Sequence, residues 1–133
     1  MNKLFVGQSA YFSKTISESD VYGFAGIVGD FNSVHVNEIV AQKSIFGKRV
    51  AHGMLVGSLV STVLGTKLPG EGTIYLEQNF QFLKPVYFGD TVTATVTVLE
   101  ILNEEKGIYK LDTTIVNQNG DMTHKGYAVV KYL

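Results

Sequence analysis

Apolar residues in the first quarter of the chain recur at the spacing of a helix face. Between residues 15 and 29 they stand at i, i+3, i+4 and i+7, as Val21, Phe24, Ala25 and Val28. Ser17 followed by Asp20 resembles a capping box, and Gly29 is a suitable stop. Asn37 is placed to cap a second, short helix that carries the apolar residues Ile39, Val40 and Ala41.

The middle of the chain predicts a different kind of helix. From Gly53 to Leu64 it is apolar on nearly every side, which is typical of a long buried helix, and Pro69-Gly70 lies beyond its end. Small residues follow one another at four-residue intervals, as Gly53, Gly57, Ser61 and Gly65. Such a stripe lets either a packed sheet or a ligand approach the helix closely, and the sequence leaves both interpretations open.

From residue 73 onward the pattern changes to the alternation of β-strands. Four segments alternate or are rich in β-branched and aromatic residues, namely 73–83, 91–101, 107–117 and 125–133. In the first of them, one face is expected to carry Ile74, Leu76, Phe80 and Phe82. "NQNGD" (117–121) predicts a hairpin turn, and "FGD" (88–90) marks another turn.

Helices followed by a run of strands predict an α+β fold, a curved antiparallel sheet wrapped around one long buried helix. We find no internal repeat or linker, and 133 residues suit one domain over 1–133. Composition agrees, because 45% hydrophobic and 17% charged residues is a globular balance.

Charge and cysteine content narrow the classes of function. The net charge is −1 and no long basic run occurs, so we expect no nucleic-acid partner. With no cysteine, the chain has no disulfide, no thiolate nucleophile and no cysteine metal site. Neither a signal peptide nor about 20 consecutive apolar residues is present, so we expect a cytoplasmic protein without a membrane partner.

The segment "VGDFNSVH", residues 28–35, contains two residues able to exchange protons, Asp30 and His35. In one interpretation, Asp30 or Asn32 makes turn hydrogen bonds and His35 lies on the surface. In the other, the carboxylate and the imidazole hold a water molecule, one taking a proton as the other gives one. Such general acid–base work contributes about 10²–10⁴ in rate. The eight residues alone favour the turn.

Other candidate chemistry is weaker. A metal site from Asp30, His35 and His52 can be drawn, but the sequence has neither H-x-x-x-H nor H-x-x-E-H, so we expect no metal. His124 falls in the strand-rich tail. The serines of the apolar helix lack a G-x-S-x-G elbow, and "LPGEGT" lacks the Lys-Ser/Thr of a phosphate-binding loop.

Gly53 changes the balance in favour of an active site. It would open the buried helix, so its N–H would be one of the unsatisfied donors at a helix N-terminus. A thioester carbonyl bound there would be polarised, and losing one such donor typically costs about 10²–10³ in rate. An acid, a base and an oxyanion donor are what the addition of water to a conjugated thioester requires.

With these residues the chain resembles the MaoC-like, hydratase-2 branch of the hot-dog superfamily, and most of all the short (R)-specific enoyl-CoA hydratases. The branch signature is an acid, then x-N-P-aliphatic-H, then five residues and Ala or Ser. It is matched by Asp30, Phe31, Asn32, Ser33, Val34, His35 and Ala41. "AHGM", "LPGEGTIYLEQNFQFLKPV" and "FGDTV" match further, so the resemblance covers nearly the whole chain. Ser33 departs from the family proline, which would fix φ near roughly −65° and constrain Asn32.

The resemblance implies reversible syn hydration of trans-2-enoyl-CoA to (R)-3-hydroxyacyl-CoA. In it, Asp30 takes a proton from water, His35 shares the water and relays a proton towards Cα, and the Gly53 N–H binds the thioester oxygen. Ser61 supports Asp30 or the carbonyl, and Asn32 fixes the loop. No metal and no cofactor beyond the substrate's coenzyme A is implied. Family members are dimers joined edge to edge, so we expect a homodimer or a higher homo-oligomer.

Two other functions stay open on the sequence. A hot-dog acyl-CoA thioesterase would direct water at the carbonyl carbon, although the Asp-x-Asn-x-x-His spacing argues against it. A non-catalytic subunit that binds acyl-CoA or acyl-carrier protein is the third, and the intact acid–base pair argues against it. The pathway can be polyhydroxyalkanoate precursor supply, fatty-acid oxidation or fermentation.

Overall fold

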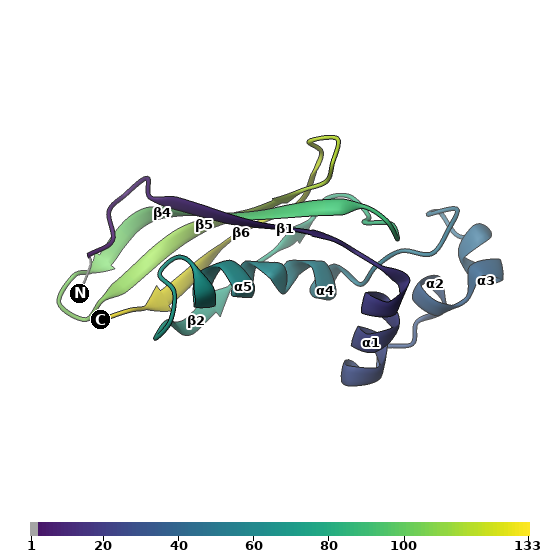
Figure 1. The fold of residues 1–133 in the computed structure, drawn as a ribbon, viewed down its shortest axis with the longest axis horizontal. Coiled ribbons are helices and arrows are strands. Elements are labelled where there is room, and N and C mark those ends of the chain that lie inside the picture. Colours follow the sequence, from purple (N-terminus) through teal and green to yellow (C-terminus); the bar gives the residue numbers. More distant parts are fainter. Residues whose placement is uncertain (1–2) are drawn as a thin grey trace.

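The computed structural model describes residues 3–133 as one antiparallel sheet with a helical layer along one face (Figure 1). The strands are β1 (Ser9–Thr15), β2 (Ile74–Gln78), β3 (Gln81–Phe82), β4 (Thr91–Asn103), β5 (Ile108–Val116) and β6 (Met122–Lys131). The helices are α1 (Glu18–Val28), α2 (Ser33–Val36), α3 (Glu38–Gln42), α4 (Gly53–Gly57) and α5 (Leu59–Thr66). The strand order is β1-β4-β5-β6-β2, and β3 also pairs with β6. This confirms the predicted α+β hot-dog class.

The strand alternation and the turns follow the prediction. Inward positions on β4 are at most 1% exposed, namely Val92, Ala94, Val96 and Val98. The threonines between them are half-buried on the other face. The predicted hairpin joins β5 to β6, where the Asn117 N–H donates to the Asp121 carbonyl at 2.9 Å. Gly120 there has φ +80°, and Gly89 in the other turn has φ +90°, a region that favours glycine.

The central helix is two short helices in succession, where one long helix was expected. Ser58 separates α4 from α5, and its hydroxyl donates back to the Leu55 carbonyl at 2.5 Å. A serine that bonds its own backbone competes with the helix ladder, and the preceding Gly57 is a weak helix former. None of the described helices is long and apolar enough to cross a membrane.

Only one side of this pair of helices is buried, which corrects the expectation of burial on nearly every side. The buried side packs against the sheet and carries Val56, Leu59, Val60, Val63 and Leu64, each 7% exposed or less. On the other side Met54 is 60% exposed, and Ser58, Ser61 and Gly65 are exposed as well.

The segment 73–83 is not the single strand that was predicted. A bulge lies between Tyr75 and Glu77, and Asn79 then crosses β6, with its N–H donating to the Tyr127 carbonyl at 3.1 Å. The break turns Ile74 and Leu76 outward, and they are 55% and 51% exposed. β1 was missed altogether, although its Ala10 and Phe12 alternate inward and pack against the core.

The helices α1, α2 and α3 form an overhang at one end of the sheet (Figure 1). Their caps are as predicted. The Ser17 hydroxyl and the Asp20 carboxylate make the reciprocal capping box at 3.0 Å each, and Gly29 ends α1 with φ +81°. The Asn37 side chain accepts the first free N–H of α3, from Val40 at 3.1 Å.

Arg49 ties the overhang together. Its guanidinium donates to the Glu38 carboxylate of α3 at 2.7 Å and to the Glu18 carboxylate of α1 at 3.1 Å. This bridge joins α1 and α3, the helices on either side of the segment that contains Asp30 and His35.

Candidate active site

Asp30 lies in the exposed loop after α1, where two of its groups are held by hydrogen bonds. One carboxylate oxygen accepts the Asn32 N–H at 3.1 Å, and its backbone carbonyl accepts the Nε2–H of His52 at 2.9 Å. Asn32 in turn caps α2, because its side-chain oxygen accepts the Val34 N–H at 3.3 Å. The turn hydrogen bonds use one carboxylate oxygen and leave the other for a further partner.

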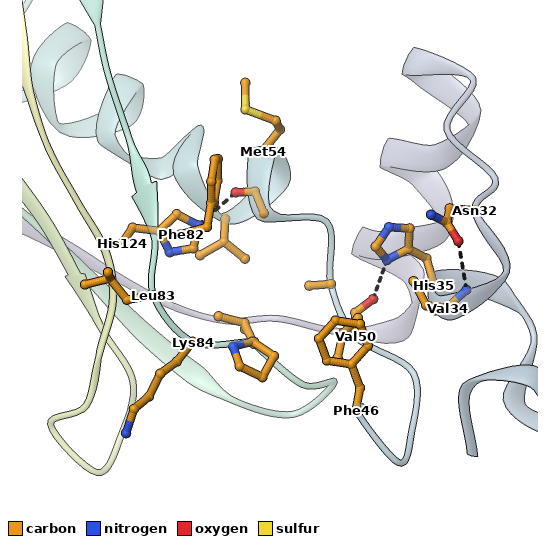
Figure 2. Close-up of a pocket in the computed structure, with 15 residues that line it drawn as sticks. Asn32, Val34, His35, Phe46, Val50, Met54, Phe82, Leu83, Lys84 and His124 are labelled. Carbon is orange, nitrogen blue, oxygen red and sulfur yellow. Dashed lines mark hydrogen bonds between the residues drawn. The ribbon is translucent and has the colours of Figure 1, made fainter. Parts of the chain in front are cut away.

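His35 lies on α2, half-buried, with its imidazole pointing into a cavity (Figure 2). Its Nδ1 is 2.7 Å from the Val50 carbonyl oxygen. Because a carbonyl only accepts, Nδ1 carries the hydrogen, and in the neutral ring the lone pair is on Nε2. The sequence gives no signal for this bond, since the acceptor is a backbone atom. The bond to Val50 leaves Nε2 of the neutral His35 ring as a hydrogen-bond acceptor.

His52 is buried directly behind this pair. Its ring stacks on His35 with centroids 3.8 Å apart and planes 25° apart, and Phe24 lies 4.9 Å away. One carboxylate oxygen of Asp30 and one nitrogen from each imidazole lie within 4.8 Å of one another. A zinc site needs nitrogens about 2.0–2.1 Å from the metal and aimed at one point. Each ring donates one N–H to a backbone carbonyl, His35 to Val50 and His52 to Asp30, so the two rings are held by hydrogen bonds.

Gly53 is the first residue of α4, so its N–H has no partner within the helix. A Cβ at this position would lie 2.7 and 2.8 Å from two ring atoms of Phe82, so the close packing requires glycine. Gly57 is packed in the same way against Phe80, at 2.9 Å. The packing interpretation of the small-residue stripe therefore holds at these two positions. Because α4 has only five residues, the helix dipole at Gly53 is weaker than one long helix would supply.

His124 is a site residue that the sequence reasoning missed. It lies on β6, 2% exposed, and its Nε2–H donates to the Gly53 carbonyl at 2.9 Å (Figure 2). Its Nδ1 is 2.8 Å from the Thr123 hydroxyl, and its ring meets Phe82 edge-on at 5.2 Å. Burial lowers the pKa of His124, and the bond to the Gly53 carbonyl partly opposes that shift. No local motif could reveal this contact, because its partners are 71 residues apart.

His35, Gly53 and His124 line a cavity of about 570 Å³, within the range of small-molecule sites. His35 and His124 approach it from opposite sides (Figure 2). The rest of the lining is mostly apolar and includes Val34, Phe46, Val50, Val56, Phe82 and Val86. Gly53 and His35 therefore line the same, largely apolar cavity.

Asp30 does not line this cavity, although one of its carboxylate oxygens lies within 4.8 Å of a ring nitrogen of His35, which does. The other predicted site residue outside the cavity lining is Ser61. It lies on α5 and lines a second, shallower groove of about 380 Å³, together with Tyr75 and Leu76 of β2. Met54 lines both spaces. The role expected for Ser61 stays a prediction.

Comparison with known proteins agrees with this geometry. The model of the family "MaoC like domain" matches residues 4–119. An (R)-specific enoyl-CoA hydratase of Rhodospirillum rubrum is 57% identical over 100 residues, covering 75% of this chain and 69% of the relative. One from Aeromonas caviae is 44% identical over 128 residues, covering 96% and 95%.

The solved structures show the same fold. The (R)-hydratase of A. caviae involved in PHA biosynthesis superposes with a TM-score of 0.94 at 43% identity, covering 100% of both chains. The match of sequence and fold over this length leaves one assignment, and the chain belongs to the MaoC-like domain family.

Proposed function

We propose that the protein is an (R)-specific enoyl-CoA hydratase, which adds water reversibly to trans-2-enoyl-CoA to give (R)-3-hydroxyacyl-CoA. The observation that carries this proposal is that His35 and Gly53 line one cavity, with the Asp30 carboxylate within 4.8 Å of the His35 imidazole and with Gly53 as the first residue of its helix. Relatives that are (R)-specific enoyl-CoA hydratases, matched over most of their length, support it.

In the proposed reaction the carboxylate of Asp30 takes a proton from a water molecule. The water oxygen forms its bond to Cβ, and the Cα–Cβ double bond becomes an enolate on the thioester. The Gly53 N–H donates to the enolate oxygen and stabilises the charge that develops there. His35 holds the water through Nε2, and the proton that Asp30 took is passed back through Nε2 of His35 to Cα on the same face, which gives syn addition and returns both residues to their starting states. No cofactor beyond the substrate's coenzyme A takes part in this scheme.

The test is hydration of crotonyl-CoA, followed by loss of the enoyl-thioester absorbance and by the stereochemistry of the product. We expect Asp30→Asn and His35→Ala each to lower kcat by about 10²–10⁴. Asp112→Asn, the same chemical change on β5 outside the cavity, is the matched control and should keep full activity. Full activity in either site variant would refute the mechanism, and release of free thiol without hydration would favour a thioesterase.

We also propose that the protein is a homodimer joined at the β2 edge. Ile74, Tyr75 and Leu76 are 55%, 41% and 51% exposed on this strand, which is the last in the sheet. An apolar edge strand with free backbone groups is a surface that proteins normally cover. The groove that contains Ser61 runs beside it. A role in a polyhydroxyalkanoate pathway, to which the A. caviae hydratase belongs, and a cytoplasmic location stay predictions for this chain.

A further inference from the structure

His52 contacts both members of the acid–base pair without lining the cavity. It donates to the backbone of Asp30 and stacks on the ring of His35, and its own peptide bond supplies the Gly53 N–H. We propose that His52 is a positioning residue that holds Asp30 and His35 in register with each other. This inference rests on the proposed hydratase function.

The hydrogen bond to Asp30 determines which nitrogen of the His52 ring carries the donated hydrogen. The acceptor is a carbonyl at 2.9 Å from Nε2, so Nε2 carries the hydrogen and Nδ1 carries the lone pair in the neutral ring. Nδ1 is buried and has no hydrogen-bond partner among the described residues. The bond from Nε2 to Asp30 is therefore the one hydrogen bond that the His52 ring makes to the described residues.

The His52 ring also packs against two other aromatic rings. The ring centroid of His52 lies 4.9 Å from that of Phe24 on α1 and 3.8 Å from that of His35 on α2. His52 itself is 3% exposed. His52 is thus, together with Arg49 and Val50, one of the contacts through which the segment before α4 reaches the overhang. The bond to Asp30 spans 22 residues, whereas the other hydrogen bond to Asp30, from Asn32, lies within the loop itself.

This arrangement predicts an effect on catalysis rather than on substrate binding. Asp30 is exposed, so its loop relies on few contacts for its position. A displacement of about 1 Å in a catalytic group can cost about 10²-fold in rate. Since His52 lies outside the cavity lining, its loss should leave the contacts of the acyl chain and coenzyme A in place.

The experiment compares two substitutions in the full-length protein. His52→Phe keeps a flat ring between Phe24 and His35 but removes the donor to Asp30. His52→Gln keeps an N–H near the position of Nε2 but removes the ring. With crotonyl-CoA we expect His52→Phe to lower kcat by about 10–100-fold with KM within about threefold, and His52→Gln to recover part of the loss. Phe24→Leu, which changes the packing and keeps the hydrogen bond, should lower kcat by less than about threefold.

A double-mutant cycle separates positioning from a merely structural role. If His52 acts through Asp30, His52→Phe should cause no further loss of kcat in the Asp30→Asn background. An unchanged kcat in His52→Phe, or an equal loss in both backgrounds, would overturn the inference. If His52→Phe does not fold, His52→Asn, whose shorter amide does not reach the Nε2 position, takes its place beside His52→Gln. A wild-type protein that hydrates no enoyl-CoA would instead refute the proposed function itself.

Discussion

Replacement of His124 by leucine should destabilise the protein in a pH-dependent way. The imidazole is 2% exposed, donates to the Gly53 carbonyl and stands 2.8 Å from the Thr123 hydroxyl. Leucine keeps an apolar side chain beside Phe82 and removes both hydrogen bonds. The Thr123 hydroxyl can turn to the Ile115 carbonyl at 3.2 Å, so the main loss falls on Gly53. A buried group that loses its partner costs about 1–3 kcal/mol, which we expect as the loss at pH 8.

The pH dependence follows from the lowered pKa of His124. Below the ordinary value of 6.5 the unfolded chain binds a proton that the folded protein does not yet bind. The free energy of unfolding that His124 contributes is therefore complete above pH 6.5 and is lost as the pH falls through the lower folded pKa. Inside this window the wild type loses up to about 1.4 kcal/mol per pH unit through this residue. His124→Leu has no imidazole at this position and does not lose stability in this way. The difference in free energy of unfolding between the wild type and His124→Leu should therefore become smaller as the pH falls.

Urea unfolding at fixed protein concentration between pH 8 and pH 5 measures this difference. His124→Gln is the matched variant, because it keeps a donor near Gly53 but has no group that titrates in this range. We expect it to be close to the wild type at pH 8 and to follow the slope of His124→Leu below pH 6.5. Parallel curves for the wild type and His124→Leu down to pH 5 would show that the folded pKa of His124 is not lowered.

Two further substitutions test the loop and the proposed dimer. Ser33 is the first residue of α2, and Asn32 before it has ψ 131°, within the range that a following proline allows. Ser33→Pro should therefore raise the free energy of unfolding by about 0.4–1 kcal/mol with kcat unchanged, and a loss of stability would show a different loop. Leu76→Lys places a charge on the exposed β2 edge and should shift sedimentation towards the monomer, whereas Asn119→Lys in the hairpin turn should not. A fully dimeric Leu76→Lys would contradict the proposed edge.

The features that the sequence predicted correctly are those decided by neighbours in the chain. The capping box at Ser17, the cap at Asn37 and the hairpin at 117–121 each depend on a few consecutive residues. The alternation of β4 is equally local, because one buried face requires every second residue to be apolar. Such patterns carry the same meaning in any surrounding fold.

The features that the sequence did not predict depend on contacts across the fold. The strand 73–83 breaks because Asn79 crosses β6, where a Cβ on Gly126 would lie 1.9 Å from the Asn79 carbonyl oxygen. The roles of His52 and His124 depend on backbone carbonyls at Asp30 and Gly53, which any residue type could supply. A histidine that bonds to a distant backbone atom has no spacing by which it can be recognised.

The two interpretations of residues 28–35 describe the same hydrogen bonds. The turn bond from the Asn32 N–H fixes one oxygen of the Asp30 carboxylate, and the Asn32 side chain starts the helix that carries His35. An exposed carboxylate in a loop without these bonds would occupy many rotamers, and acid–base chemistry requires a fixed one. In the proposed mechanism, a polar turn at this place is therefore the means by which the acid is oriented. The turn interpretation and the active-site interpretation of residues 28–35 are therefore compatible in the folded protein.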